Sequence, residues 1–549
     1  MFATKRALAI LSAISLAGCF GNPPFHAASE SPPSQDVCAG IYKAFDDAVG
    51  PAPHQCGTLD AVTADAKGMS DCLAGVVDSP KTGGSNNACW HTPSEAHTQA
   101  HIPYDLYFTE FDDQGWEADL RQKPDTRKTE IDNVFENLGK GLDENHPIDI
   151  VVFTHGWHGS SEPDNYYAVL FRAFLGQLAQ IDQQEIPPRR VVGIFVGWRG
   201  DSGLGFPAKY LSVWDRKLAA ETVSTGAVQG LFERLHRFYL NHSCHPSGTQ
   251  SVSGTEANCG QVHMLTIGHS FGAIINFRSL LGNMETGLTT PEGERVYSFG
   301  DLVVLLNPAF EGTRYAPLYY SALRRLGGYV GPGEKYGGAQ LPVVVTLQSK
   351  GDDATRYAFP FFREVTTSAD NAIDGEKSQN VHAMGWVSEF ATHRLCLSPS
   401  DPSPNFPNGA KRPTPSCKTL ARSDGCDDPA ASGDPNDSPY SCRINKKWAP
   451  NGPDENAFKI FGAKEPPVYV GDGMTLATIP PEPGKQRPDY FPYWVVQVDK
   501  AVMLDHDDVW NPLTTSLILE LYRAAVTQGE AQAKVIKGEA VQQSAPTKE

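Results

Sequence analysis

The chain is poor in positive charge, in long apolar runs and in paired cysteine motifs, and each shortage excludes a class of protein. Its 46 Lys and Arg stand against 64 Asp and Glu, which gives a formal net charge of −18. This balance argues against a nucleic-acid partner, which needs basic surface to contact phosphates. None of the 11 cysteines has the C-x-x-C spacing of a zinc ribbon or a thioredoxin-like site. The 549 residues, 40% hydrophobic and 20% charged, are instead typical of a large globular protein.

Residues 1–18 predict an export signal. A short basic stretch precedes an apolar run over residues 7–17, which is shorter than the about 20 residues that span a bilayer. Leu16-Ala17-Gly18-Cys19 resembles the lipobox of bacterial lipoproteins, whose Cys becomes the first mature residue and carries acyl chains. The resemblance implies a lipid anchor at Cys19, and Phe20 after it favours the outer membrane, facing the periplasm or the cell surface. An ordinary cleaved signal is the alternative.

The remaining ten cysteines support export. Four lie within residues 38–89, two are Cys244 and Cys259, and four lie within residues 396–442. Each group is even in number, and disulfides are favoured in an oxidising periplasm. We expect Cys244 and Cys259 to close a surface loop, while the pairing within the two groups of four stays open.

From about residue 99, apolar runs alternate with helical patterns. Buried strands are predicted over residues 104–111, 148–154, 191–196, 262–267, 302–306, 343–347 and 493–498. Helices are predicted over residues 164–184, 228–238, 271–281 and 512–526. Repeated strand–helix units predict an α/β fold, with a mainly parallel sheet covered by helices on both faces.

The pattern also predicts how the chain is organised around this core. Residues 19–98 form a lipid-anchored tether and a cysteine-rich segment, residues 99–365 the core, residues 366–488 a long insertion rich in Cys and Pro, residues 489–526 the last core strand and helix, and residues 527–549 a polar tail. The insertion lies where a loop can reach the carboxyl ends of the strands, so we interpret it as a disulfide-rich lid or substrate wall. The alternative is that the insertion lies at the rim without a role in substrate binding.

The central motif is Gly268-His269-Ser270-Phe271-Gly272, a G-x-S-x-G pattern between a predicted strand and a predicted helix. In that setting the Ser occupies a strained turn with its hydroxyl group presented, while the two Gly residues avoid collisions with neighbouring elements. The helix N-terminus directs N–H groups at the site. A glycine-rich turn with an incidental Ser is the alternative.

At this point the chain resembles the α/β-hydrolase family, in which the nucleophile, the acid and the His follow in that order. The motif His155-Gly156-Trp157-His158-Gly159 follows the strand at residues 148–154 and matches the family's oxyanion turn. The resemblance implies that Ser270 is the nucleophile and that the N–H groups of Trp157 and Phe271 form the oxyanion hole. A simple loop is the alternative for the turn, and a metal site there would lack an evident third ligand.

The acid is expected after the strand at residues 343–347. Asp352 is our choice, because its S-x-x-D-x-A-T setting is similar to the acid turn of some bacterial members of the family. Asp353 is the nearest alternative, and Glu311, after an earlier strand, corresponds to a rarer placement of the acid.

The general base is expected in the loop after the last strand, where His506 stands among acidic neighbours that raise its pKa. His393 and His382 are alternatives, although they lie in the insertion rather than after a core strand. Another interpretation is that His506 is a surface residue in an acidic loop. A cation site in this loop is also an alternative, but no second segment supplies obvious cation ligands.

Together these features imply a serine hydrolase, carboxylesterase-like or lipase-like, that cleaves an ester-type carbonyl compound through an acyl-enzyme. Its substrate is expected to be a small ester or a lipid-like molecule, and the mechanism needs no metal and no organic cofactor. Its other expected partner is the membrane, through the anchor. A non-catalytic surface protein that uses the same scaffold for binding or envelope assembly is the alternative. The oligomeric state and the choice among ester, thioester and amide stay open.

Overall fold

The structure, a computed structural model, describes residues 104–528 with internal gaps, of which the longest are residues 201–211, 244–259, 331–339, 367–376 and 398–467. The predicted signal, the Cys19 anchor, the segment before residue 99, the Cys244–Cys259 pairing and most of the tail lie outside the described residues. Cys396 is disulfide-bonded. The other predicted disulfides of the insertion, and its role as a lid, stay predictions. No helix in the described part of the chain combines the length and apolar character needed to cross a bilayer.

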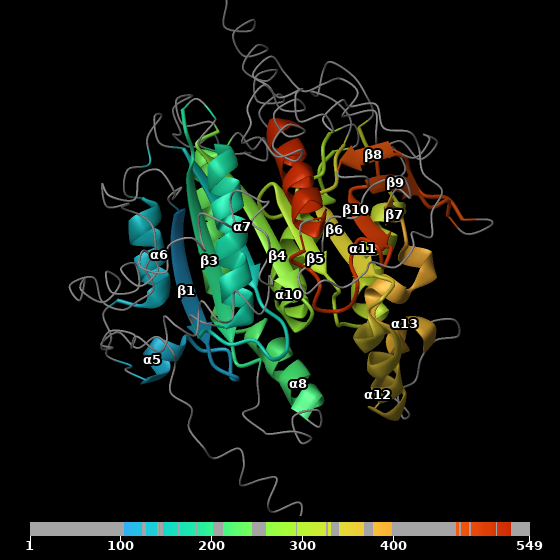
Figure 1. The fold of residues 1–549 in the computed structure, drawn as a ribbon, viewed down its shortest axis with the longest axis horizontal. Helices are drawn as coiled ribbons and strands as arrows, with labels where there is room; N and C mark the ends of the chain where they lie inside the picture. The colour runs from blue at the N-terminus through green and yellow to red at the C-terminus, as the bar shows by residue number, and fades with distance from the viewer. Residues whose placement is uncertain are drawn as a thin grey trace, which may run out of the picture.

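The core is a ten-stranded sheet with the order β1-β3-β2-β4-β5-β6-β10-β7-β9-β8 (Figure 1). Its strands are β1 (Tyr104–Phe111), β2 (Ile148–Thr154), β3 (Arg190–Trp198), β4 (Val262–His269), β5 (Leu302–Leu306), β6 (Val344–Ser349), β7 (His393–Leu397), β8 (Val468–Gly471), β9 (Met474–Thr478) and β10 (Tyr493–Val498). Every neighbouring pair from β1 to β7 is parallel, while β9 is antiparallel to both β7 and β8. The predicted α/β class with a mainly parallel sheet is confirmed.

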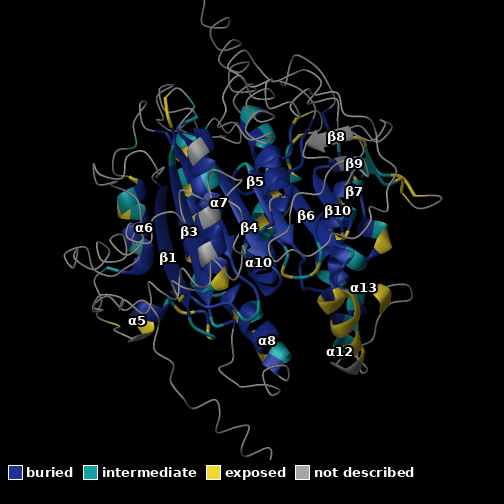
Figure 2. Cartoon of the chain, in the orientation of Figure 1, coloured by how far each residue is buried: buried dark blue, intermediate teal, exposed yellow. Residues whose placement is uncertain are grey.

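Helices cover both faces of this sheet. They are α5 (Ala118–Gln122), α6 (Glu130–Leu138), α7 (Tyr166–Asp182), α8 (Val213–Val223), α9 (Val228–His242), α10 (Phe271–Gly287), α11 (Gly312–Leu323), α12 (Phe359–Thr366), α13 (Lys377–Val381) and a C-terminal helix over residues 513–528. Successive strand residues point to opposite faces. In β2, Val152 belongs to the buried cluster that includes residues of α6 and α8 to α11, whereas Phe153 belongs to the cluster that includes residues of α7 and the C-terminal helix. Buried residues therefore fill both sides of the sheet (Figure 2).

The strand order changes side between β2 and β4, which are parallel neighbours in the sheet. From β2 the chain passes through α7 to β3 on one side, and from β4 it passes through α10 to β5 on the other side. In open parallel sheets the loops that leave such a pair diverge, and the carboxyl ends of the two strands are where ligands generally bind. The Gly156 turn and Ser270 both stand at this point.

The sheet extends further than the pattern predicted. Residues 366–488 contribute β7, β8 and β9, which lie beyond β10. Strand β7 has the sequence HRLCL. Its polar residues interrupt the apolar pattern on which the strand predictions relied. Its place is decided by pairing with β10 and β9, a tertiary contact that overrides local preference. Part of the predicted insertion is therefore part of the sheet.

Candidate active site

Ser270 occupies a strained turn between β4 and α10. Its backbone has φ 55° and ψ −117°, a conformation that residues other than Gly rarely adopt. Such a conformation costs of order 1–3 kcal/mol and persists only where its surroundings hold it. The Ser270 N–H donates to the Leu306 carbonyl group at 3.0 Å, and the Ser270 carbonyl group accepts from the Ala273 N–H at 3.1 Å. The expected strand–elbow–helix setting is present.

The glycines of the elbow permit the close contacts that were expected of them. A Cβ atom on Gly272 would lie 2.2 Å from the carbonyl oxygen of Thr154, at the end of β2. A Cβ atom on Gly268 would lie 2.7 Å from the side-chain nitrogen of Asn276, on α10. Any larger residue would therefore push the elbow away from the neighbouring strand or helix.

His506 reaches Ser270 from the loop after β10. Its Nε2 atom lies 2.9 Å from Ser270 Oγ across a sequence separation of 236 residues. On the other side of the ring, Nδ1 lies 2.9 Å from Oδ2 of Asp352. The structure thus brings together the three residues chosen as nucleophile, base and acid, in the order hydroxyl, imidazole, carboxylate.

Asp352 is buried and surrounded by donors. Its Oδ1 atom accepts from the Thr355 N–H at 2.9 Å, and its Oδ2 atom accepts from Gln348 Nε2 at 3.0 Å and from the Thr355 hydroxyl group. Burial alone would raise the pKa of Asp352, but the charge of His506, its hydrogen bond and the hydrogen bonds from Thr355 outweigh burial and lower the pKa. The carboxylate is therefore held ionised and in one orientation.

Acidic groups control the protonation of His506. Burial alone would lower the pKa of its imidazole, but Asp352, Asp507 and Asp505 outweigh burial and raise the pKa to about 9. The ring is therefore mostly cationic at neutral pH, and it becomes able to accept the Ser270 proton as the pH rises.

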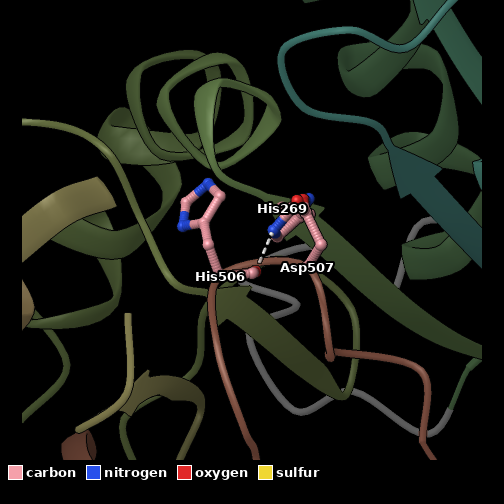
Figure 3. Close-up of side chains that lie close together, drawn as sticks. All are labelled: His269, His506 and Asp507. Atoms are coloured by element: carbon pink, nitrogen blue, oxygen red, sulfur yellow. Dashed lines mark hydrogen bonds between the residues drawn. The ribbon is translucent and has the colours of Figure 1, made fainter. Parts of the chain in front are cut away.

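A second histidine supports the His506 loop. His269 Nε2 lies 2.9 Å from the main-chain oxygen of His506, as the dashed line in Figure 3 shows. Because a carbonyl oxygen only accepts, this nitrogen carries the hydrogen. Burial and the charge of His506 lower the pKa of His269 to about 4, so the ring is neutral. Nearby, the Tyr167 hydroxyl group donates to Asp507 at 3.1 Å. These bonds fix the loop from two directions.

His269, His506 and Asp507 also place potential metal-ligand atoms within 4.8 Å of one another. Hydrogen bonding accounts for this arrangement. The Nε2 atom of His269 donates to a carbonyl group, Asp507 accepts from Tyr167, and both nitrogens of His506 face Ser270 or Asp352. We therefore interpret the group as part of a hydrogen-bonded network.

Asn307 is a site residue that the sequence analysis passed over. It follows β5 directly, with φ 42°, and its Nδ2 atom donates to the main-chain oxygen of His506 at 2.9 Å. Its Oδ1 atom accepts from the Ser349 N–H at 2.8 Å. The available signal was a polar residue placed immediately after a fully buried strand, at the edge where parallel strands carry functional groups.

The turn after β2 stands beside Ser270. A Cβ atom on Gly156 would lie 2.8 Å from Cβ of Ser270, so the backbone of this turn directly faces the elbow. His155 holds the turn from behind, because its Nε2 atom accepts from the Trp198 N–H at 3.1 Å and its Nδ1 atom is 2.9 Å from the Gly156 carbonyl oxygen. Burial lowers the pKa of His155 to about 4. One ring nitrogen therefore contacts the turn at Gly156, and the other ties it to the end of β3 at Trp198.

The two alternative acids, Asp353 and Glu311, lie in surroundings that differ from those of Asp352. Asp353 is exposed at the start of the turn that follows Asp352. Glu311 is buried and paired with Lys217 at 2.9 Å, Arg314 at 2.7 Å and Arg363 at 3.0 Å. Burial alone would raise the pKa of Glu311, but the three cations lower it to about 2. Glu311 therefore holds α8, α11 and α12 together.

The alternative bases are also engaged elsewhere. His393 lies in β7, with its ring centroid 4.2 Å from that of Trp494. Burial and the charge of Arg487 lower its pKa to about 3. His382 lies just after α13, and its Nδ1 atom is 2.9 Å from the Ser378 carbonyl oxygen. Among the described residues, neither of these rings forms a hydrogen bond with Ser270, whereas the His506 ring does.

Comparisons with known proteins add no relative. No protein-family model matches the chain, and no significant match was found among curated proteins or solved structures. The chemistry of this site must therefore be argued from its own geometry.

Proposed function

We propose that the protein is a serine hydrolase with an α/β-hydrolase fold that cleaves an ester-type carbonyl substrate, in the manner of a carboxylesterase or lipase. One observation carries the proposal: Ser270, in a strained strand–helix elbow, lies 2.9 Å from His506, whose other ring nitrogen lies 2.9 Å from a buried Asp352. A nucleophile, a base and a group that orients the base are the parts that acyl transfer to water requires.

The first step is proton transfer coupled to attack. Asp352 favours the His506 tautomer with hydrogen on Nδ1, which leaves the Nε2 lone pair directed at the Ser270 hydroxyl group. His506 accepts the hydroxyl proton while Ser270 Oγ forms a bond to the carbonyl carbon of the substrate. The imidazolium that results is stabilised by the nearby carboxylate and returns the proton to the leaving group.

The developing oxyanion is assigned to the N–H groups of Phe271 and Trp157. Phe271 begins α10, so its N–H has no acceptor within that helix and stands at the positive end of the helix dipole. Trp157 follows Gly156, whose backbone faces Ser270. Water then attacks the acyl-enzyme, with His506 as the base a second time, and the free Ser270 hydroxyl group is restored.

The proposal includes export and a lipid anchor at Cys19, in the outer membrane and facing the periplasm or the cell surface. It rests on the sequence motif alone. Mass analysis of the mature N-terminus tests it, because lipidation at Cys19 adds acyl chains to a chain that begins at that residue. A mature protein that begins elsewhere, or an unmodified Cys19, would contradict this part of the proposal.

Covalent labelling tests the hydrolase itself. A fluorophosphonate probe is expected to label the folded wild-type protein and to fail with Ser270→Ala. Ser279→Ala is a matched control, because Ser279 lies on the same helix and its hydroxyl group donates to the Ser224 carbonyl group at 2.8 Å, outside the site. Absence of labelling in folded wild-type protein refutes the proposal and supports a binding role. A series of p-nitrophenyl esters of rising chain length then defines the acyl preference.

A further inference from the structure

Trp386 contacts the acid turn from a separate segment of the chain. It lies in a short 3-10 turn over Met384–Trp386, after α13. Its Nε1 atom donates to the hydroxyl oxygen of Thr355 at 2.9 Å, and Thr355 in turn donates to Asp352. The guanidinium carbon of Arg356 lies 5.1 Å from the Trp386 ring centre and helps to hold the indole in place.

The donor chemistry gives this chain of hydrogen bonds one direction. An indole N–H only donates, so the Thr355 oxygen must accept from Trp386. The side-chain nitrogen of Gln348 also donates to that oxygen, at 3.1 Å. Thr355 therefore receives two hydrogen bonds on its oxygen, and its single hydroxyl hydrogen is directed to Asp352. Each bond polarises the next, so the indole strengthens the bond to the carboxylate.

The backbone of the 3-10 turn is shaped for this contact. A Cβ atom on Gly385 would lie 2.4 Å from Oε1 and 2.7 Å from Cβ of Gln348. Only the absence of a side chain at Gly385 lets the turn approach β6 closely enough for Trp386 to reach Thr355. Gln348 itself donates to Asp352 at 3.0 Å, so the turn packs directly against two of the side chains that hold the acid.

We propose that Trp386 is a positioning residue that acts on the Asp352 carboxylate through Thr355, and thereby on His506. The inference rests on the proposed serine hydrolase function. Trp386 fixes the rotamer of the Thr355 hydroxyl group, and the fixed hydroxyl group holds Asp352 Oδ2 toward His506 Nδ1, 2.9 Å away. Residues 377–390, within the segment interpreted from sequence as an insertion, thus contribute to the alignment of the catalytic groups.

A double-mutant cycle tests the route of this effect. Trp386→Phe keeps the aromatic ring and removes the N–H group, and it should lower kcat about 3- to 10-fold with KM unchanged. Thr355→Val should lower kcat at least as much, while Thr355→Ser, which retains the hydroxyl group, should restore most of the loss. In the Thr355→Val background, Trp386→Phe should have no further effect on kcat, because the intermediate hydroxyl group is gone.

Trp494→Phe is the matched control. It removes an indole N–H that donates to the Phe491 carbonyl group at 2.9 Å, so it changes an equivalent bond outside the acid turn. It should leave kcat within twofold of wild type. An unchanged kcat in Trp386→Phe, or an equal loss in the presence and absence of the Thr355 hydroxyl group, would overturn the proposal.

A spectroscopic readout separates this inference from the proposed function. A proton shared between His506 Nδ1 and Asp352, which lie 2.9 Å apart, is expected to give a low-field NMR signal that does not depend on turnover. Trp386→Phe should move or broaden that signal, and Trp494→Phe should not. If the wild-type protein is not labelled by a fluorophosphonate but the signal still moves, the hydrolase proposal fails while the positioning contact stands. A signal unchanged in Trp386→Phe overturns the positioning role.

Discussion

The side chain of Asn307 holds the main chain of His506 in place. Its Nδ2 atom donates to the His506 carbonyl oxygen at 2.9 Å and lies 3.2 Å from the Asp505 carbonyl oxygen. Its Oδ1 atom accepts from the N–H of Ser349, at the end of β6, at 2.8 Å. One side chain at the end of β5 therefore couples the strand that leads to the acid with the loop that carries the base.

Removal of the Asn307 side chain should slow catalysis while the protein stays folded. Asn307→Gly tolerates the positive φ and leaves the His506 loop without its donor. We expect the rate of Ser270 labelling to fall about tenfold or more, with a modest fall in Tm. Asn137→Ala is the control, because Asn137 Nδ2 donates to a carbonyl group at 2.8 Å within α6, outside the site. Equal labelling rates in Asn307→Gly and Asn137→Ala would show that the His506 loop does not need Asn307.

The raised pKa of His506 predicts an enzyme whose activity is highest at alkaline pH. Only the neutral imidazole accepts the Ser270 proton, and the pKa is raised to about 9. The value of kcat/KM should therefore rise about tenfold per pH unit below this pKa and level off above it. The dependence is measured as the initial rate of ester hydrolysis between pH 6 and pH 10. A flat profile between pH 6 and pH 9 would contradict the raised pKa of His506.

The acidic neighbours of His506 allow the same prediction to be tested by mutation. Asp505 and Asp507 both raise the pKa of His506, so Asp505→Asn and Asp507→Asn should each move the midpoint of the profile to lower pH. Asp507→Asn keeps an acceptor for the Tyr167 hydroxyl group. Asp113→Asn is the control, because Asp113 pairs with Arg216 at 2.9 Å rather than with the His506 loop. A midpoint that moves equally in all three variants would indicate a general charge effect.

The two buried carboxylates should respond differently to loss of charge. Asp352→Asn removes the group that orients His506 and should lower the rate of Ser270 labelling by about 10³- to 10⁴-fold in folded protein. Glu311→Gln leaves Lys217, Arg314 and Arg363 without the anion they share. It should lower the free energy of unfolding by about 3–5 kcal/mol. Its folded fraction should still label at close to the wild-type rate. Labelling rates and urea unfolding separate these effects, and Asp353→Asn, at an exposed position, should change neither.

Some elements were predictable because their information is local. Strands such as Ile148–Thr154 and Leu302–Leu306 are mainly apolar runs, and their observed limits match the predicted ones. The Ser270 elbow was equally predictable from sequence, because two glycines, an apolar strand and a helix all lie within a few residues. Strand β7 was not, because its polar sequence becomes a strand only through its pairing with β10 and β9.

Chain order and residue type restricted the base and the acid to a few candidates, but they did not rank them by distance. The identity of the motif, the alternation of strands with helices and the position of each candidate after a strand are properties of neighbouring residues, and the amino acids alone determined them. The contact of His506 with Ser270, the engagement of Glu311 by its three cations, and the support from Asn307 and Trp386 depended on the tertiary structure. These contacts join residues tens to hundreds of positions apart, and the register and packing of the sheet, which no local pattern encodes, decide which of them meet.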